Sequence, residues 1–276
     1  ATLGQTDPTF RRGIECIHAR LSKNLTRFDG NLAGVTLPRL DAGEISATRL
    51  ERWVECPFAY FSEYVLGIQG EEEPVVGTHL SALVRGSIIH RCLERLVVEG
   101  LEQGMLPKPG GSWSAEDHSR LSELLIEECD RADARGEAAH PLFWPVIRSR
   151  MDTDLQTFLV EDSAIRASQN STPLVAEYRF GGSTALPVVL ADGRVLRFRG
   201  AIDRVDRVDS GGVAVIDVKS GKPDHYRPIR ADTPFPTGTR LQLPIYGLAA
   251  ETLGHGPTGD AAFAFLGTER SGDRRI

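Results

Sequence analysis

The sequence GVAVIDVKSG, residues 212–221, predicts the central strand of the fold. A run of four apolar residues that begins and ends near glycines is typical of a buried strand. Because side chains alternate along a strand, Asp217 and Lys219 point to one face while Ile216 and Val218 point to the other. Two opposite charges at the end of a buried strand are costly unless they pair or bind something. We therefore predict a functional site at this end of the strand.

Length and composition are those of an ordinary globular protein. The chain has 276 residues, of which 41% are hydrophobic and 25% charged, enough to bury a full core. No apolar run approaches the roughly 20 residues that span a bilayer, so we expect no membrane partner. The net charge of -6 argues against a protein that coats nucleic acid through its overall charge. The first residue is Ala1, and we expect a piece of a longer protein.

The four cysteines form no CxxC pair and have no regular spacing. This pattern favours mostly buried free thiols in a reducing cytoplasm over a disulfide framework or a zinc site. They are Cys16, Cys56, Cys92 and Cys129.

Hydrophobic periodicity divides the chain into a helical first part and a strand-rich second part. We assign residues 1–45 to an N-terminal extension of unclear role and residues 46–276 to one domain. Helices are predicted at residues 46–55, 57–65, 81–100, 115–135, 141–169 and 240–253. Further strands are predicted at residues 174–180, 188–190, 194–199, 201–208 and 261–266. This order predicts an α/β fold, α+β in a broad sense, with a central mixed sheet flanked by helices and an N-terminal helical part.

The helix predicted at residues 46–55 has a clear start signal. Ser46 or Thr48 can serve as the N-cap, and Thr48-x-x-Glu51 fits a capping box. The large apolar side chains of this helix form its apolar face, and with the aromatic cluster of the next helix they favour the core, with a base-stacking platform as the alternative. They are Leu50, Trp53, Val54, Phe58, Phe61, Tyr64 and Val65.

A second acidic residue accompanies the predicted central strand. Asp203 lies on the preceding strand, and adjacent antiparallel strands would bring it within about 5 Å of Asp217. Two carboxylates, a main-chain carbonyl and water are ligands that Mg²⁺ or Mn²⁺ prefers. With Lys219 beside them, the group predicts metal-assisted hydrolysis of a phosphodiester. For Asp203 alone, the alternative is an ion-paired turn residue, because Arg204 and Arg207 are close in sequence.

These residues resemble the D…(D/E)xK signature of the PD-(D/E)xK nuclease superfamily, with Asp203 followed by Asp217-Val218-Lys219. Other segments, in the family's order from about Ile45 to the C terminus, resemble its RecB/AddB branch. These are Ser46–Glu51 with Cys56-Pro57-Phe58, Arg85–His90 and Gln242–Tyr246. The resemblance implies a restriction-endonuclease-like core and a metal-dependent, exonuclease-like activity on DNA.

The resemblance also implies roles for individual residues. His90, Asp203 and Asp217 match metal ligands, with the Val218 carbonyl as a further ligand for Mg²⁺ or Mn²⁺. Three more residues match catalytic positions, namely Lys219, Gln242 and Tyr246. His90 lies beside the apolar stripe of its helix, where a structural histidine is the alternative. Glu177 also has a counterpart in many relatives, and a strand-end salt bridge is its alternative.

Some relatives hold a [4Fe-4S] cluster with one cysteine before the nuclease core and three after it. Cys56 matches the first position, but no cysteine follows Cys129, so we expect no iron–sulfur cluster in this chain. Either the natural protein continues past Ile276 with the missing ligands, or Cys56 is a buried relic.

Residues 219–240 carry five basic side chains against two acidic ones, which predicts a track for DNA phosphates. The basic residues are Lys219, Lys222, Arg227, Arg230 and Arg240. A helicase subunit or helicase domain as partner in DNA repair is implied by the resemblance alone, since the chain has no GxxxxGK[ST] loop. A catalytically inactive DNA-binding scaffold is the main alternative. A site-specific endonuclease is a third, for which we identify no sequence-reading element.

Overall fold

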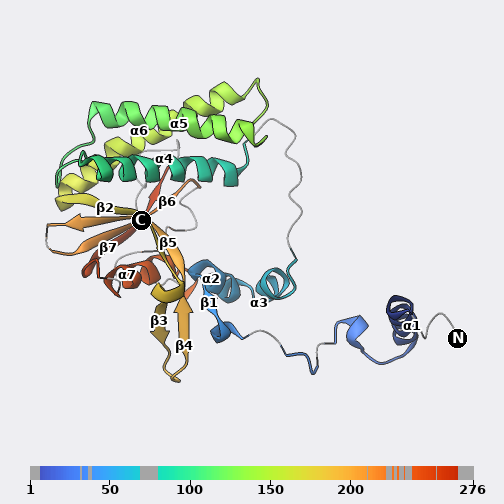
Figure 1. Cartoon of the computed structure of the whole chain (residues 1–276). Coiled ribbons are helices and arrows are strands. Elements are labelled where there is room, and N and C mark those ends of the chain that lie inside the picture. Colours follow the sequence, from blue (N-terminus) through green and yellow to red (C-terminus); the bar gives the residue numbers. More distant parts are fainter. Residues whose placement is uncertain are drawn as a thin grey trace. The chain divides into compact units, whose positions relative to one another are not determined.

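The computed structural model describes residues 7–31, 33–36, 39–68, 80–209, 211–221, 226, 229, 233, 238–252 and 254–266 (Figure 1). The chain forms two compact units, Ala1–Arg39 and Leu40–Ile276. The smaller unit contains helix α1 (Pro8–Leu21) and the 3-10 helix η2 (Arg27–Asp29). Asp7 caps α1, because its Oδ1 accepts the main-chain N–H groups of Thr9 and Phe10.

The larger unit contains helices first and strands afterwards, as the periodicity predicts. Its first elements are η3 (Leu40–Ala42), β1 (Glu44–Ile45), α2 (Ala47–Glu55), α3 (Pro57–Tyr60), the π-helix η4 (Phe61–Val65), α4 (Ala82–Gln103), α5 (Ala115–Ala134) and α6 (Trp144–Gln169). They are followed by β2 (Ser171–Phe180), η5 (Gly182–Thr184), β3 (Leu186–Val189), β4 (Val195–Phe198), β5 (Gly200–Val208), β6 (Val213–Lys219), α7 (Gln242–Thr252) and β7 (Thr258–Phe265).

The central sheet has the strand order β2-β5-β6-β7. The β2–β5 and β5–β6 pairs are antiparallel and the β6–β7 pair is parallel, so the predicted mixed sheet is confirmed. The predicted hairpin also forms, as β3 and β4, but it belongs to a separate sheet with the order β1-β4-β3. Strand β4 of the hairpin pairs with β1, and the N–H of Arg199 donates to the Ile45 carbonyl at 3.0 Å.

Helices cover both faces of the central sheet. Figure 1 shows α4, α5 and α6 stacked over one face and α7 on the other. Alternate residues of β6 pack to the two sides: Ile216 and Val218 join the α4–α6 core, while Val213 and Val215 join the core that contains α7. The same alternation assigns Asp217 to the α7 face.

A buried ionic network holds α6 against β5. Arg204 donates to Asp162 Oδ1 at 2.5 Å and pairs with Asp206 at 2.8 Å. Asp162 Oδ2 also accepts from Arg166 Nε at 3.0 Å and from Trp113 Nε1 at 2.8 Å. Although burial acts to raise the pKa of Asp162, the two guanidinium groups outweigh it and the pKa is lowered. The network therefore keeps Asp162 charged and fixes the strand that carries Asp203.

The prediction that the large apolar residues of α2, α3 and η4 lie in the core was wrong for Trp53, Val54, Phe58 and Tyr64. Their exposed fractions are 42%, 38%, 77% and 37%. Tyr64 and the buried Tyr60 instead hold Arg49, whose Cζ lies 5.0 and 5.4 Å from the two ring centroids. A cation held by two rings takes the place of an apolar core contact here.

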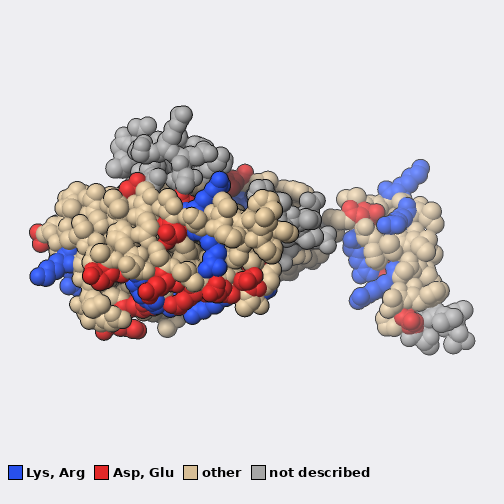
Figure 2. Space-filling model, turned by 90° about the horizontal axis from the view of Figure 1, so that it is seen from above, with Lys and Arg blue, Asp and Glu red and all other residues tan. Residues whose placement is uncertain are grey.

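On the face of the larger unit shown in Figure 2, Lys and Arg side chains lie interspersed with Asp and Glu. Among the described residues, charged side chains of α4 and α5 pair with each other, for example Arg120 Nε with Glu99 at 2.8 Å. The helical layer therefore presents no single-sign field to a polyanion over its described residues. No helix in the described parts of the chain is both long enough and apolar enough to cross a bilayer.

Asp162→Ala should destabilise the protein by about 3–5 kcal/mol, because it leaves two buried guanidinium groups without their shared carboxylate. Denaturant unfolding followed by circular dichroism measures this loss. Asp130→Ala, which removes the exposed partner of Arg148, is the matched control and should cost less than about 1 kcal/mol. Equal losses in the two variants would contradict the structural importance of the buried network.

Candidate active site

Asp203 and Asp217 come from neighbouring strands at one end of the sheet. The last main-chain pair between β5 and β6 at this end is Arg204 with Ile216, so the next positions on the two strands are Asp203 and Asp217. Asp203 Oδ2 accepts the main-chain N–H of Val218 at 2.6 Å. One carboxylate thus joins the two strands where their main-chain pairing ends, next to the second carboxylate.

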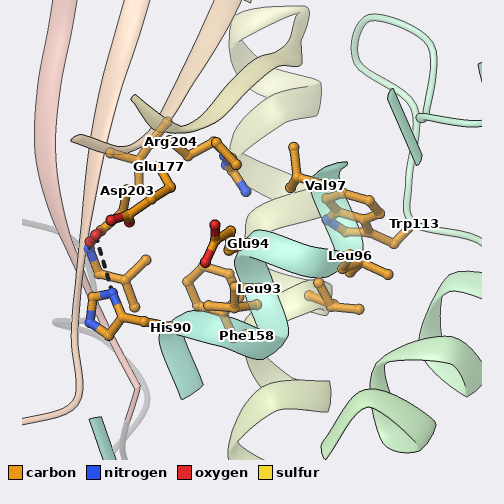
Figure 3. A pocket seen from close by; sticks show the side chains of 14 residues that line it. His90, Leu93, Glu94, Leu96, Val97, Trp113, Phe158, Glu177, Asp203 and Arg204 are labelled. Atoms are coloured by element: carbon orange, nitrogen blue, oxygen red, sulfur yellow. Dashed lines mark hydrogen bonds and ion pairs between the residues drawn. The ribbon is translucent and has the colours of Figure 1, made fainter. Parts of the chain in front are cut away.

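His90 reaches Asp203 from α4. Its Nδ1 lies 3.1 Å from Asp203 Oδ1, the contact drawn in Figure 3. Burial disfavours the imidazolium, but the hydrogen bond and the charge of Asp203 outweigh it, and the pKa of His90 is raised. His90 therefore has a specific polar partner in the predicted site, although α4 otherwise packs its apolar stripe against the core.

Gln242, the first residue of α7, connects three of the other predicted site residues, Asp217, Lys219 and Tyr246. Its Nε2 donates to Asp217 Oδ1 at 2.8 Å and to the Tyr246 hydroxyl at 3.1 Å. Its Oε1 accepts from Lys219 Nζ at 3.0 Å, and Lys219 also pairs directly with Asp217. The Lys219 ammonium lies 5.1 Å from the centroid of the Phe263 ring. The amide therefore fixes a carboxylate and an ammonium beside each other.

Burial differs between the two charged groups at the end of β6. Asp217 is 2% exposed, whereas the Lys219 side chain is 22% exposed. Burial raises the pKa of Asp217 to about 6, even though the Lys219 ammonium favours the carboxylate. Burial also raises the pKa of Tyr246 to about 12, so its hydroxyl stays protonated near neutral pH. Lys219 is the group of this pair that a ligand from solvent can reach.

Gly200 allows α7 to approach the sheet at this point. A Cβ on Gly200 would lie 2.9 Å from the Phe180 ring and 3.0 Å from the Tyr246 ring. These two rings pack edge to face, with centroids 5.9 Å apart. The missing side chain therefore lets Tyr246 sit where its hydroxyl meets Gln242.

Glu177 lies on β2 between the residues that pair with Arg204 and Ile202, and so next to Asp203 on β5. Its backbone has a φ of 46°, a conformation that non-glycine residues rarely adopt. The predicted alternative for Glu177, a salt bridge, is present, because Arg179 Nη2 lies 2.8 Å from its carboxylate. Burial raises the pKa of Glu177. The rare backbone conformation of Glu177 lies next to the predicted site, and such conformations cluster at functional sites. Glu177 thus combines this position with the ion pair to Arg179.

A pocket leads from the predicted site into the space between α4, α6 and the sheet (Figure 3). His90, Glu177 and Asp203 lie at its polar end, and Trp113 lies at its apolar end. Glu94 also lines the pocket and was missed by the sequence analysis. Its position four residues after His90 on one helix gave a signal, since such residues share a face.

Two alternatives from the sequence analysis were wrong. Asp203 is not the ion-pair partner of Arg204, because that guanidinium is enclosed with Asp162 and Asp206. Cys56 is not a buried relic: it is exposed, and its Sγ accepts the N–H of Ala59 at 3.4 Å as the cap of α3. All four cysteines are free thiols, but only Cys92 and Cys129 are buried.

Most of the predicted phosphate track lies outside the described residues, namely Lys222, Arg227 and Arg230. Arg240 is described, and its Nη1 pairs with Glu55 at 2.6 Å. Its guanidinium also lies 5.4 Å from the centroid of the Tyr226 ring. Arg240 is therefore engaged within the protein.

The donor set suits a hard divalent cation, since it contains two carboxylates and an imidazole. Both carboxylates are hydrogen-bonded by protein donors, Asp203 by Val218 and Asp217 by Gln242. Among the described residues, no group of three His, Cys, Asp or Glu side chains converges closely enough to hold an ion. The chemistry of these side chains fits a metal ion. In this arrangement the oxygens of both carboxylates take part in hydrogen bonds within the protein.

Comparison with known proteins identifies the family. The family model of the PD-(D/E)XK nuclease superfamily matches residues 44–276. Curated relatives are named as subunits of an ATP-dependent helicase/deoxyribonuclease. The relative from Symbiobacterium thermophilum is 30% identical over 258 residues, which cover 88% of this chain and 21% of that protein. The relative from Oenococcus oeni is 27% identical over 237 residues, 79% of this chain and 19% of that protein.

The chain thus spans about a fifth of the length of these two curated relatives. The region matched by the family model begins before α2 and includes all the predicted site residues, from His90 to Tyr246. The carboxylates, the lysine and the Gln242 amide therefore lie within the matched region, and this chain belongs to the PD-(D/E)XK nuclease superfamily.

Proposed function

We propose that this chain is a Mg²⁺- or Mn²⁺-dependent DNA nuclease of exonuclease type. The observation that carries the proposal is the placement of Asp203 and Asp217 at adjacent strand ends, with Lys219 held beside Asp217 by the Gln242 amide. Two carboxylates and a lysine in this arrangement suit hydrolysis of a phosphodiester.

The cation would be held by His90, Asp203, Asp217 and the Val218 carbonyl. When bound, it supplies Lewis acidity toward the phosphate that is cleaved. Although burial raises the pKa of Asp217 to about 6, this value lies below neutral pH, so the carboxyl is mostly deprotonated there and can act as a ligand. The hydrogen bond between His90 and Asp203 orients the imidazole toward the same region.

Lys219 acts on the water and the phosphate. Its ammonium is partly exposed and can orient the attacking water or stabilise negative charge that develops on the phosphate. Gln242 and the Phe263 ring limit where this ammonium can lie. Tyr246 holds the Gln242 amide from the next turn of α7 and so supports the same geometry.

We further propose that the domain works with or within a helicase in DNA repair and recombination, in the cytoplasm. Support comes from the relatives, whose name combines an ATP-dependent helicase with a deoxyribonuclease. The competing hypothesis is a DNA-binding scaffold of the same fold without catalysis. It predicts binding to DNA that is unaffected by loss of Asp217 or Lys219 and no cleavage under any metal condition.

Asp217→Ala and Lys219→Ala should each lower metal-dependent cleavage by about 10²- to 10⁴-fold, because each removes a group that acts at the reacting phosphate. The assay uses end-labelled single- and double-stranded linear DNA with Mg²⁺, Mn²⁺ or EDTA. The product ladder separates exonuclease from endonuclease action.

The matched controls for these variants are Asp192→Ala, in an exposed turn, and Lys108→Ala, outside the site. Both should cleave at the wild-type rate. Cleavage that persists in Asp217→Ala and Lys219→Ala would contradict the assigned site. Binding without cleavage by the wild-type chain, in every metal tested, would favour the scaffold.

The cleavage rate should fall as the pH is lowered through about 6, because Asp217 takes up a proton and no longer binds a cation. A proton and a cation compete for the same carboxylate. Tenfold more Mg²⁺ should therefore move the midpoint of the pH profile to lower pH, by up to about one unit. Rates measured over a pH series that brackets this midpoint, at two Mg²⁺ concentrations, test this, and a midpoint independent of Mg²⁺ would refute the competition.

A further inference from the structure

The first turn of α7 receives its cap from a distant helix. Glu51, on α2, accepts the main-chain N–H groups of Leu241 at 2.5 Å and of Gln242 at 3.0 Å with one carboxylate oxygen. The first N–H groups of a helix have no partner inside the helix, and a carboxylate is well suited to them. Glu51 therefore satisfies donors at the residue that organises the candidate site.

The sequence of α7 explains why the cap comes from elsewhere. The residue before the helix is Leu241, whose side chain has no oxygen that could accept an N–H. The expected capping box at α2 does not form: Ser46 alone caps that helix, through its Oγ and the N–H of Arg49 at 3.2 Å. The carboxylate of Glu51 is thereby available to α7. Burial raises the pKa of Glu51, and both N–H donors counteract that rise.

Gln242 depends on its main chain being fixed. Both ends of its amide are used, the nitrogen by Asp217 and Tyr246 and the oxygen by Lys219, within distances of 2.8 to 3.1 Å. Gln242 is also the first residue of α7, a position where helices fray without a cap. A shift of its main chain would lengthen the hydrogen bonds to Asp217 and Lys219 together.

We propose that Glu51 is a positioning residue of the nuclease site, which acts through Gln242 on Asp217 and Lys219. The proposal rests on the proposed nuclease function. The described hydrogen bonds of Glu51 go to the main-chain N–H groups of Leu241 and Gln242 and not to Asp217 or Lys219. Glu51 is therefore assigned to the alignment of the reacting groups and not to catalysis itself. The proposal gives α2 a role at the site, although none of the proposed catalytic or metal-binding residues lies on this helix.

A neighbouring contact provides the matched control. Glu55, one turn further along α2, pairs with Arg240 Nη1 at 2.6 Å. It holds the same helix against the same segment, but it accepts no N–H of Gln242 among the described hydrogen bonds. Glu55→Ala therefore removes an attachment of α2 without removing the cap.

The experiment measures kcat and KM for linear DNA with the wild-type chain, Glu51→Ala, Glu51→Gln, Glu55→Ala, Gln242→Ala and the double variant Glu51→Ala/Gln242→Ala. Glu51→Ala should lower kcat by about 10- to 100-fold with little change in KM, as is typical when support of a reacting group is lost. Glu51→Gln keeps an acceptor oxygen and should lose less. Glu55→Ala should resemble the wild type.

The double variant distinguishes positioning from a general structural role. If Glu51 acts through Gln242, its removal from Gln242→Ala costs no further activity. Additive losses, or full activity of Glu51→Ala, would overturn the proposal. Thermal unfolding of each variant identifies any that fails to fold. If Glu51→Ala fails to fold, Glu51→Gln is compared with the wild type in its place.

A readout without catalysis separates this proposal from the proposed function. Amide hydrogen exchange at Leu241 and Gln242, measured by NMR, should be faster in Glu51→Ala than in the wild type and unchanged in Glu55→Ala. If the wild-type chain cleaves no DNA, the proposed function fails, and faster exchange at these two amides still supports the positioning contact. Unchanged exchange would overturn it.

Discussion

The burial of Asp217 at the end of a central strand is the constraint on which the site depends. A carboxylate that is 2% exposed loses most of its hydration and requires protein donors and a nearby opposite charge. Gln242 and Lys219 supply both, and Gln242 can do so only if α7 lies against the sheet at one position. The absence of a side chain at Gly200 and the packing of Tyr246 against Phe180 fix that position.

Arg204 and Asp203, which are neighbours on β5, are charged side chains that the protein stabilises in different ways. Arg204 is enclosed with Asp162 and Asp206, so charge is balanced inside the protein. Asp203 is hydrogen-bonded instead by a main-chain N–H and by an imidazole that is partly exposed. A closed ion network gives rigidity, while a carboxylate with a titratable partner near solvent remains open to ligands. Adjacent residues of one strand thus combine a rigid support with a reactive group.

Local sequence patterns were sufficient for most strands and helices and for the expectation that Asp203, Asp217 and Lys219 lie together, whereas His90, Gln242 and Tyr246 were assigned through the family resemblance. The alternation in residues 212–221 identified both the buried strand and the face from which Asp217 and Lys219 project. Contacts between distant segments could not be predicted in this way. The capping-box pattern favoured Glu51 as a local cap, whereas its carboxylate serves Gln242, 191 residues further along the chain. The local pattern pairs Asp162 with Arg166 one turn further along α6, which is common on helix surfaces. The partners that make this a buried network, Arg204 on β5 and Trp113 before α5, are distant in sequence and could not be predicted locally.

The carboxylate oxygens that would bind a cation already accept hydrogen bonds from protein donors. Asp217 already accepts from Gln242 and pairs with Lys219, and Asp203 already accepts from Val218. A cation that binds these oxygens competes with the protein donors, so part of its attraction to the carboxylates is used to rearrange them. The Gln242 amide contacts both Asp217 and Lys219, so a change in either hydrogen bond would alter the other. The carboxylate that would hold a cation and the ammonium that would act on the phosphate are therefore linked through one side chain.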